Sequence, residues 1–171
     1  SLLPAFGRTF MLALRIIDIK DFTSKLFLGD VFHRFYFVEA SFSTFITHTL
    51  DGTLHKDFYD SDHVPQRPYC YWEEIKSQCQ WIIRGKRTPL GFKIVFQLSQ
   101  ENTAKLLTQS GLPLLPEDIY GLYLNCQFEN GQLSCTTGTS LRIFTLDKRL
   151  DTIWDDMVKR FFKQQGISFI L

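Results

Sequence analysis

A short basic turn is a first place where side chains of one chemistry gather. Arg84, Lys86 and Arg87 surround Gly85, and three cations beside exposed backbone could bind a phosphate group or a nucleic-acid backbone. Cations and a glycine at the end of a helix are also typical of an ordinary helix C-terminus. With 19 Lys and Arg against 18 Asp and Glu, the net charge of +1 gives no long-range attraction to nucleic acid or anionic membrane. The turn is therefore a candidate anion site, and nucleic acid is a possible but not favoured partner.

Two histidines flank a predicted hairpin turn at Asp51-Gly52. A two-residue turn there would pair His48 with His55 and put Asp57 farther along the same face. Two imidazoles and a carboxylate are ligands that transition metals accept. No spacing rule supplies the remaining ligands, with His63 the nearest addition, and a polar cross-strand pair near an exposed turn has the same pattern. A metal site at His48, His55 and Asp57 is thus an alternative, not the leading interpretation.

Two of the four cysteines are predicted to face each other. A hairpin turn at Asn130-Gly131 sets Cys126 directly opposite Cys135, at a position where cross-strand side chains come closest. A redox-responsive disulfide between them is conceivable. Both share the apolar face of their strands, however, and the start of the chain lacks the layout of a secretory signal. Two buried, reduced thiols in a cytoplasmic protein are the simpler interpretation.

Hydroxyl side chains cluster at 136–140, where a glycine interrupts a run of threonine and serine. Such a turn could hold an anion or a nucleophile. No histidine or acid is assigned beside it, and hydroxyl residues with glycine are common in ordinary turns. The chain also lacks a glycine-rich phosphate loop. We therefore predict no catalytic residue and no cofactor.

The elements that must position these residues alternate between strands and helices. Two-residue alternation and short apolar runs predict strands, and capping residues, helical spacing and glycine stops predict helices. The expected strands are 12–17, 35–50, 53–58, 92–98, 122–129, 132–137, 141–146 and 167–171. The expected helices are 18–29, 72–85, 99–111 and one that begins at Asp147 or Asp151 and ends at Gly166.

Three weak sequence echoes, each about 80 residues apart, suggest two copies of one unit. Each half, about 11–89 and 90–171, reads β-α-β-β-α, and strand 92–98 would serve both halves. The expected fold is α+β, a mostly antiparallel sheet with helices packed on it, with a ferredoxin-like plait as the nearest analogue. Residues 11–171 are predicted to form one domain, and residues 1–10 to be a leader or an expression remnant.

Several phrases resemble a family of small bacterial proteins classified only as a domain of unknown function. They are found at 82–90, 121–125, 136–140 and 144–148, and together with Met11 they imply a resemblance from about Met11 to Phe169. The resemblance implies a bacterial cytoplasmic protein. It brings no activity, cofactor or site residue.

The leading hypothesis is a non-enzymatic binding or interaction module. A small metal-dependent hydrolase or transferase is one alternative, and nucleic-acid or phosphate binding through 84–87 is another. The partner is unknown. No apolar stretch reaches the length of a membrane span, so a membrane partner is not expected. A homo-oligomer joined through a sheet edge or an aromatic patch is a third possibility.

Overall fold

In the computed structural model of the chain, residues 9–171 are described. They form an eight-stranded antiparallel sheet in the order β3-β2-β5-β6-β7-β1-β8, with β4 also paired to β2. The strands are β1 (Thr9–Ile16), β2 (Tyr36–Ser43), β3 (Thr47–Asp51), β4 (Cys70–Tyr71), β5 (Gly91–Gln97), β6 (Ile119–Glu129), β7 (Gln132–Leu141) and β8 (Phe169–Ile170). The helices are α1 (Ile19–Phe27), α2 (Trp72–Ile83), α3 (Gln100–Ser110) and α4 (Arg149–Gln164), with short 3₁₀ turns η1 (Lys56–Phe58) and η2 (Pro116–Asp118). The predicted α+β class with an antiparallel sheet is confirmed.

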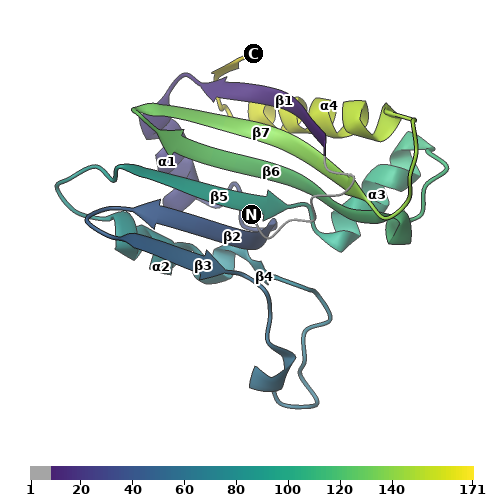
Figure 1. Cartoon of the computed structure of the whole chain (residues 1–171), viewed down its shortest axis with the longest axis horizontal. Helices are drawn as coiled ribbons and strands as arrows, with labels where there is room; N and C mark the ends of the chain where they lie inside the picture. Colours follow the sequence, from purple (N-terminus) through teal and green to yellow (C-terminus); the bar gives the residue numbers. More distant parts are fainter. Residues whose placement is uncertain (1–8) are drawn as a thin grey trace.

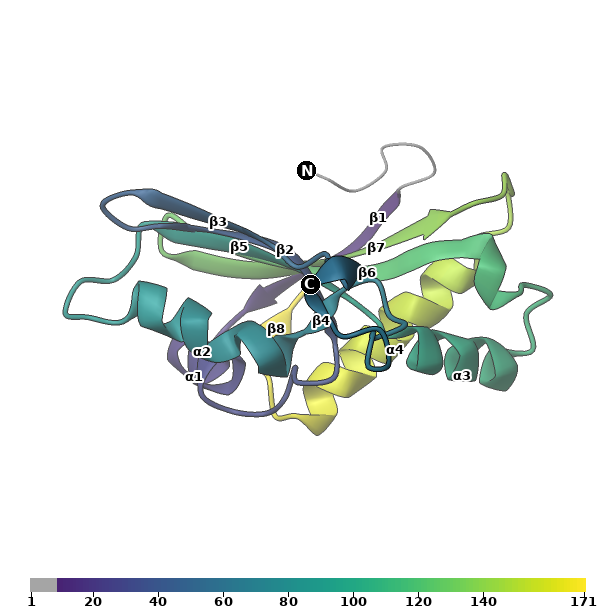
Figure 2. The same cartoon turned by 90° about the horizontal axis from the view of Figure 1, so that it is seen from below.

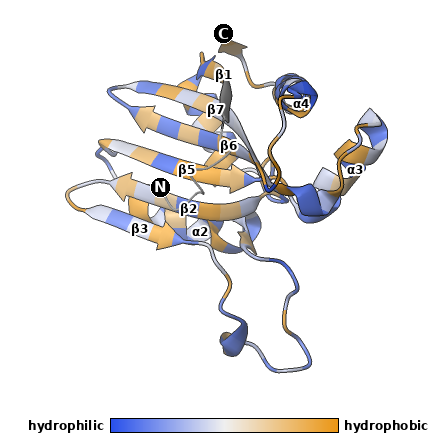
Figure 3. Ribbon diagram, turned by 45° about the vertical axis from the view of Figure 1, so that its right-hand side comes forward, coloured by the Kyte–Doolittle hydropathy of each residue, from blue (hydrophilic) through white to orange (hydrophobic). Residues whose placement is uncertain are grey.

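All four α-helices lie on one face of the sheet, as Figures 1 and 2 show. Strand residues that point to the helices are apolar and alternate with more polar ones on the other face, which is visible as banding in Figure 3. Trp72 of α2 and Trp154 of α4 are fully buried in this layer. Their indole N–H groups donate to Leu26 O at 2.8 Å and Tyr123 O at 2.9 Å. Each tryptophan therefore adds a hydrogen bond to its apolar burial.

The sheet order differs between the two halves of the chain. β5 pairs with β2 on one side and β6 on the other, so it joins both halves as expected. β1, by contrast, pairs with β7 and β8 and not with a strand of its own half. The halves thus occupy non-equivalent positions in the sheet, which leaves the ferredoxin-like plait and the internal repeat without confirmation.

The prediction of a hairpin turn at Asp51-Gly52 is wrong, because the turn forms earlier in the chain. β2 turns back through 44–46 into β3, and Phe42 pairs with His48. The described backbone gives Gly52 no positive φ; instead, a Cβ atom there would lie 1.9 Å from Phe37 O. The glycine is required by a close backbone approach beside the bulge in β2, a constraint that its sequence neighbours do not reveal.

The chain after Gly52 also departs from prediction. No strand forms at 53–58; Thr53 makes one bridge to Tyr69, and the intervening loop projects from the sheet (Figure 1). Likewise, the expected strand 141–146 is absent, because β7 continues through Gly138 to Leu141. The sequence patterns of these polar and glycine-containing segments fit either a strand or a turn. Pairing with neighbouring strands determines which of the two forms.

Other predictions at the ends of elements are confirmed. Asp18 caps α1 and Ser99 caps α3, each accepting a hydrogen bond from a backbone N–H of the first turn. Asn130 and Gly131 have φ of 53° and 73°, as a tight β6–β7 turn requires. The backbone of Thr9 and Phe10 belongs to β1, while residues 1–8 of the expected leader lie outside the described residues. Within the described chain, no helix is both long and apolar enough to cross a membrane.

Candidate binding site

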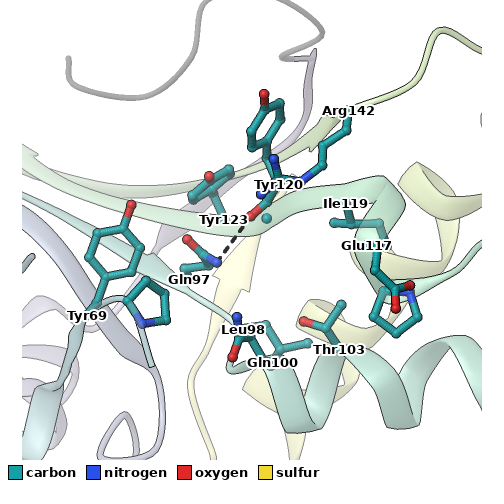
Figure 4. A pocket seen from close by; sticks show the side chains of 13 residues that line it. Tyr69, Gln97, Leu98, Gln100, Thr103, Glu117, Ile119, Tyr120, Tyr123 and Arg142 are labelled. Carbon is teal, nitrogen blue, oxygen red and sulfur yellow. Dashed lines mark hydrogen bonds between the residues drawn. The ribbon is translucent and has the colours of Figure 1, made fainter. Parts of the chain in front are cut away.

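A pocket of about 710 Å³ lies at one end of the sheet, where β5 leads into α3 and β6 begins. Figure 4 shows its lining converging from four places in the chain: Tyr69 before β4, Gln97 at the end of β5, Thr103 on α3, and Tyr120 and Tyr123 on β6. These residues are far apart in sequence. The pairing of β5 with β6 and the turn into α3 bring most of them together, and the pairing of β4 with β2 places Tyr69 beside them.

Gln97 is a buried polar side chain in the pocket wall. Its amide nitrogen donates to Tyr120 O at 3.3 Å, but its Oε1 atom has no hydrogen-bond partner in the described chain. Two more buried atoms without a partner, Asn125 Oδ1 and Ser140 Oγ, lie on the same helix-free face, as the strand register indicates. A buried acceptor left unsatisfied costs about 1–3 kcal/mol, so a donor from a bound molecule would be favoured at Gln97.

Gly121 allows the pocket wall to be flat. A Cβ atom at this residue would lie 2.7 Å from the ring and hydroxyl of Tyr123 and 2.9 Å from the side-chain amide carbon of Gln97. The missing side chain therefore lets Tyr123 lie along β6, over Gly121 and beside Gln97. The result is an aromatic surface next to an amide.

Five of the six tyrosines gather around this end of the sheet. Tyr36 lies 6.2 Å from Tyr69 and 5.5 Å from Tyr71, measured between ring centroids. Arg142 lies over the ring of Tyr120, with its guanidinium carbon 4.0 Å from the centroid. Burial raises the pKa of Tyr69, with Asp51 and Glu39 adding to the effect, so its hydroxyl stays neutral at physiological pH.

The N-terminus of α3 borders the pocket, and most of its first backbone N–H groups already have partners. Ser99 accepts a hydrogen bond from Asn102 N, and Gln100 N donates to the Tyr36 hydroxyl at 3.2 Å. Among the described lining residues, the ionisable groups other than tyrosine are Glu117 and Arg142. The pocket thus offers ring faces, an amide and hydroxyls rather than a concentrated charge, which suits a neutral ligand.

The basic turn lies at the other end of the sheet from this pocket. Arg84 is the C-cap of α2, and Lys86 and Arg87 follow it in the exposed loop that leads to β5. The Arg84 guanidinium carbon lies 5.0 Å from the ring centroid of Trp81. Gly85 has φ of 133°, which fits the predicted helix stop. Anion binding at Arg84, Lys86 and Arg87 stays a prediction.

The histidine pair is not brought together as expected. His48 lies on β3 opposite Phe42, whereas His55 and Asp57 lie in the projecting loop. The register predicted for a turn at Asp51-Gly52 is wrong, and with it the reason for placing the two imidazoles side by side. Across residues 9–171, no group of three or more His, Cys, Asp or Glu side chains is arranged to hold a metal ion. The metal-dependent enzyme therefore stays an alternative without a positioned ligand set.

The predicted pairing of Cys126 with Cys135 is confirmed. Cys126 faces Cys135 across the β6–β7 ladder, both are buried, and both are free thiols. Burial raises the pKa of Cys135. Elsewhere, burial raises the pKa of Cys70 to about 11 and that of Cys79 to about 12. Thiols whose pKa values are raised by burial form little thiolate, so these cysteines are expected to be unreactive.

The hydroxyl segment of β7 has acidic partners that sequence reasoning missed. Thr137 donates to Asp155 Oδ1 and Thr139 donates to Asp151 Oδ1, each at 2.5 Å. Burial raises the pKa of Asp155, although the Thr137 hydrogen bond opposes that effect. Both threonines are buried between β7 and α4, so these pairs connect the helix to the sheet and are closed to a substrate.

The tyrosine-lined pocket itself was not predicted. Its residues come from segments with different patterns, and no short motif links Tyr69, Gln97 and Tyr123. The pairing of Gln97 with Tyr123 could have been inferred only from a correct register between β5 and β6.

Comparison with known proteins gives a family but no activity. A family model matches residues 25–170, and its description is a family of unknown function, DUF5721. No curated protein matches the chain. No solved structure matches it either.

Proposed function

Since the chain belongs to the family of unknown function DUF5721, we propose from the site alone that it is a non-enzymatic binding module whose tyrosine-lined pocket holds a small, neutral, ring-containing molecule. The observation that carries this proposal is the partnerless Oε1 atom of Gln97, buried in the pocket wall. A ligand N–H or O–H group would satisfy that acceptor once the neighbouring side chains move to expose it, because the atom has almost no solvent-accessible area.

The tyrosines define the shape of the ligand. Tyr69 and Tyr123 lie on either side of Gln97, as Figure 4 shows; Tyr69 is half-buried and Tyr123 is buried at the pocket wall. Flat rings stack well on tyrosine faces, and Tyr hydroxyls add polar contacts at the rim. Glu117 and Arg142 carry opposite charges, so the pocket does not select strongly for a cation or an anion. A nitrogen heterocycle with an amide or amine donor meets these requirements.

Protein NMR with named probes tests the proposal. Adenosine, cytidine and nicotinamide are titrated into ¹⁵N-labelled protein, and the side-chain amide resonances of Gln97 are followed. We expect shifts of these resonances together with the backbone signals of Gly121 and Tyr123 for at least one probe. Gln97→Met, which keeps the volume but removes the acceptor, should weaken binding by about two- to tenfold, since one hydrogen bond contributes about 0.5–1.5 kcal/mol.

Tyr59→Leu is the matched control, because Tyr59 lies in the projecting loop and does not line the pocket. Tyr69→Leu should weaken probe binding while Tyr59→Leu leaves it unchanged. Equal binding by Gln97→Met and the unsubstituted protein, or probe-induced shifts remote from β5 and β6, would contradict the proposal.

We further propose that the scaffold derives from two β-α-β-β-α units and belongs to a bacterial cytoplasmic protein. The repeated order of elements supports the first part, as do matched i,i+4 ion pairs at Asp21–Lys25 of α1 and Glu101–Lys105 of α3. The free cysteines support a reducing compartment. A homo-oligomer is an open alternative, which light scattering would detect.

A further inference from the structure

Two loops meet at the end of the sheet opposite the tyrosine pocket. They are the β2–β3 turn (44–46) and the loop between α2 and β5 (84–90), and we call them, together with Trp81, the basic tip. Leu90 N donates to Ser43 O at 2.8 Å, which ties one loop to the other. Figures 1 and 2 both show them side by side, projecting beyond the strands.

Large apolar side chains of the basic tip are left in solvent. Phe45 is 91% exposed, Leu90 74% and Trp81 61%. Single exposed apolar residues are common, but several gathered at projecting loops mark an interaction surface. Phe45 lies in the β2–β3 turn and Leu90 lies directly before β5, and neither lines a described pocket. A flat partner can therefore reach them without a matching protrusion.

The cations of the basic tip are free to meet a negative partner. Arg84, Lys86 and Arg87 are exposed, and none of them forms an ion pair with another described residue. Glu129 of β6 pairs directly with Gly91 at the start of β5, so one acid lies beside the base of the tip, and its carboxylate accepts a hydrogen bond from Gln127. With three cations against this one acid, the tip carries net positive charge in a chain whose total net charge is only +1.

The base of the basic tip is rigid. Phe92, directly after the loop, packs against Phe27 with ring centroids 5.5 Å apart, against Phe42 at 6.0 Å and against Phe128 at 5.6 Å. This aromatic cluster holds the starts of β5 and the ends of β2 and β6 in fixed positions. The exposed side chains are thus presented on a firm support.

We propose that the basic tip docks on an anionic lipid surface, with Phe45, Leu90 and Trp81 entering the interface and the three cations contacting lipid headgroups. Aromatic and aliphatic tips flanked by Arg and Lys are the combination that such an interface favours. Single-stranded nucleic acid is the competing partner, since Phe45 and Trp81 could stack on bases, but the exposed aliphatic side chain of Leu90 favours the lipid interface. From the sequence we expected no membrane partner, because no segment is long and apolar enough to span a bilayer and the net charge is only +1. The basic tip would bind the surface of a membrane without crossing it, through charge that is concentrated locally.

Vesicle flotation tests this proposal with the full chain. Binding is measured to vesicles of phosphatidylcholine alone and to vesicles that also contain phosphatidylglycerol. We expect binding only to the anionic vesicles and weaker binding as salt is raised. Replacing Arg84, Lys86 and Arg87 together with Gln should weaken it roughly 100-fold, since each basic residue near an anionic surface strengthens binding about fivefold.

A second variant separates apolar insertion from charge. Phe45→Ser with Leu90→Ser keeps the cations and should also abolish flotation, whereas Phe58→Ser should not. Phe58 is a matched control because it is 85% exposed in a loop that carries Asp57, Asp60 and Asp62. No binding to anionic vesicles would overturn the proposal. So would equal losses from Phe58→Ser, or tight binding of a single-stranded oligonucleotide that survives Phe45→Ser with Leu90→Ser.

Discussion

The Sγ atoms of Cys126 and Cys135 lie 3.5 Å apart across the β6–β7 ladder, and both side chains are fully buried. The Cys135 thiol donates a hydrogen bond to Cys126 Sγ. Two reduced thiols at this distance pack as small apolar groups in the sheet core. Redox pairing of the two residues would need an oxidant to reach a region closed to solvent.

The native protein should therefore protect three of its four cysteines from thiol reagents. Cys79, Cys126 and Cys135 are buried, and Cys70 is half-buried. Titration with Ellman's reagent at pH 8 should detect slow reaction of Cys70 at most, while all four should react in guanidinium chloride, because only the exposed thiolate is nucleophilic. Rapid modification of Cys126 or Cys135 in the folded protein, or an intact mass lower by two hydrogens after mild peroxide treatment, would instead support a redox role.

Gly52→Ala should destabilise the protein by about 3 kcal/mol or more, in the upper range for overpacking. The added Cβ would overlap Phe37 O, a backbone atom that cannot move without disturbing β2. Urea denaturation measures the free energy of unfolding. Gly131→Ala is the comparison, because it has open space but a positive φ of 73°. That variant should lose only about 1–2 kcal/mol, and an equal loss in both would exclude the steric explanation.

Asp155→Asn should stabilise the fold at neutral pH, by less than about 1 kcal/mol for a partly exposed carboxyl group. Burial raises the Asp155 pKa above its ordinary value of 3.8, so the folded state holds this proton more tightly than the unfolded state does. The destabilisation by the charged carboxylate is absent below pH 3.8 and grows as pH rises through the folded-state pKa. An asparagine keeps the Oδ1 acceptor for Thr137.

The measurement for Asp155→Asn is urea denaturation at pH 4 and pH 7, with Asp156→Asn as control. Asp156 is exposed on the same helix and pairs with Lys159 at 3.5 Å. The advantage of Asp155→Asn over the unsubstituted protein should shrink at the lower pH, whereas Asp156→Asn should show no such gain. A stability loss at pH 7 in Asp155→Asn would mean that the charged carboxylate contributes favourably through Thr137.

Local signals predicted the β6–β7 hairpin but failed at the first hairpin. Asn130 and Gly131 both adopt positive φ, and their turn set the register that placed Cys126 opposite Cys135. Asp51-Gly52 carries a similar dipeptide, yet its glycine is explained by proximity to Phe37. The same residue type serves two physical needs, and only tertiary contacts distinguish them.

The pocket and the Thr–Asp pairs depend on long-range register. Thr139 and Asp151 are 12 residues apart and meet because α4 packs back on β7. Gln97 meets Tyr123 only because β5 pairs with β6. Sequence patterns predicted the four helices and most of the strands, although not the turn at 44–46 or the absence of strands at 53–58 and 141–146. Packing between elements determined which polar side chains came within reach of one another.

The projecting loop after β3 also bears on engineering of this chain. Its two ends are closed by Leu54 N to Pro68 O at 3.0 Å and Cys70 N to Gly52 O at 2.9 Å, so β3 and β4 continue one interrupted sheet edge. Doubling the length of a loop closed in this way costs only about 0.6 kcal/mol of entropy. The exposed segment between them is therefore a permissive place to insert a reporter peptide or a fluorescent label, remote in sequence from β5 and β6.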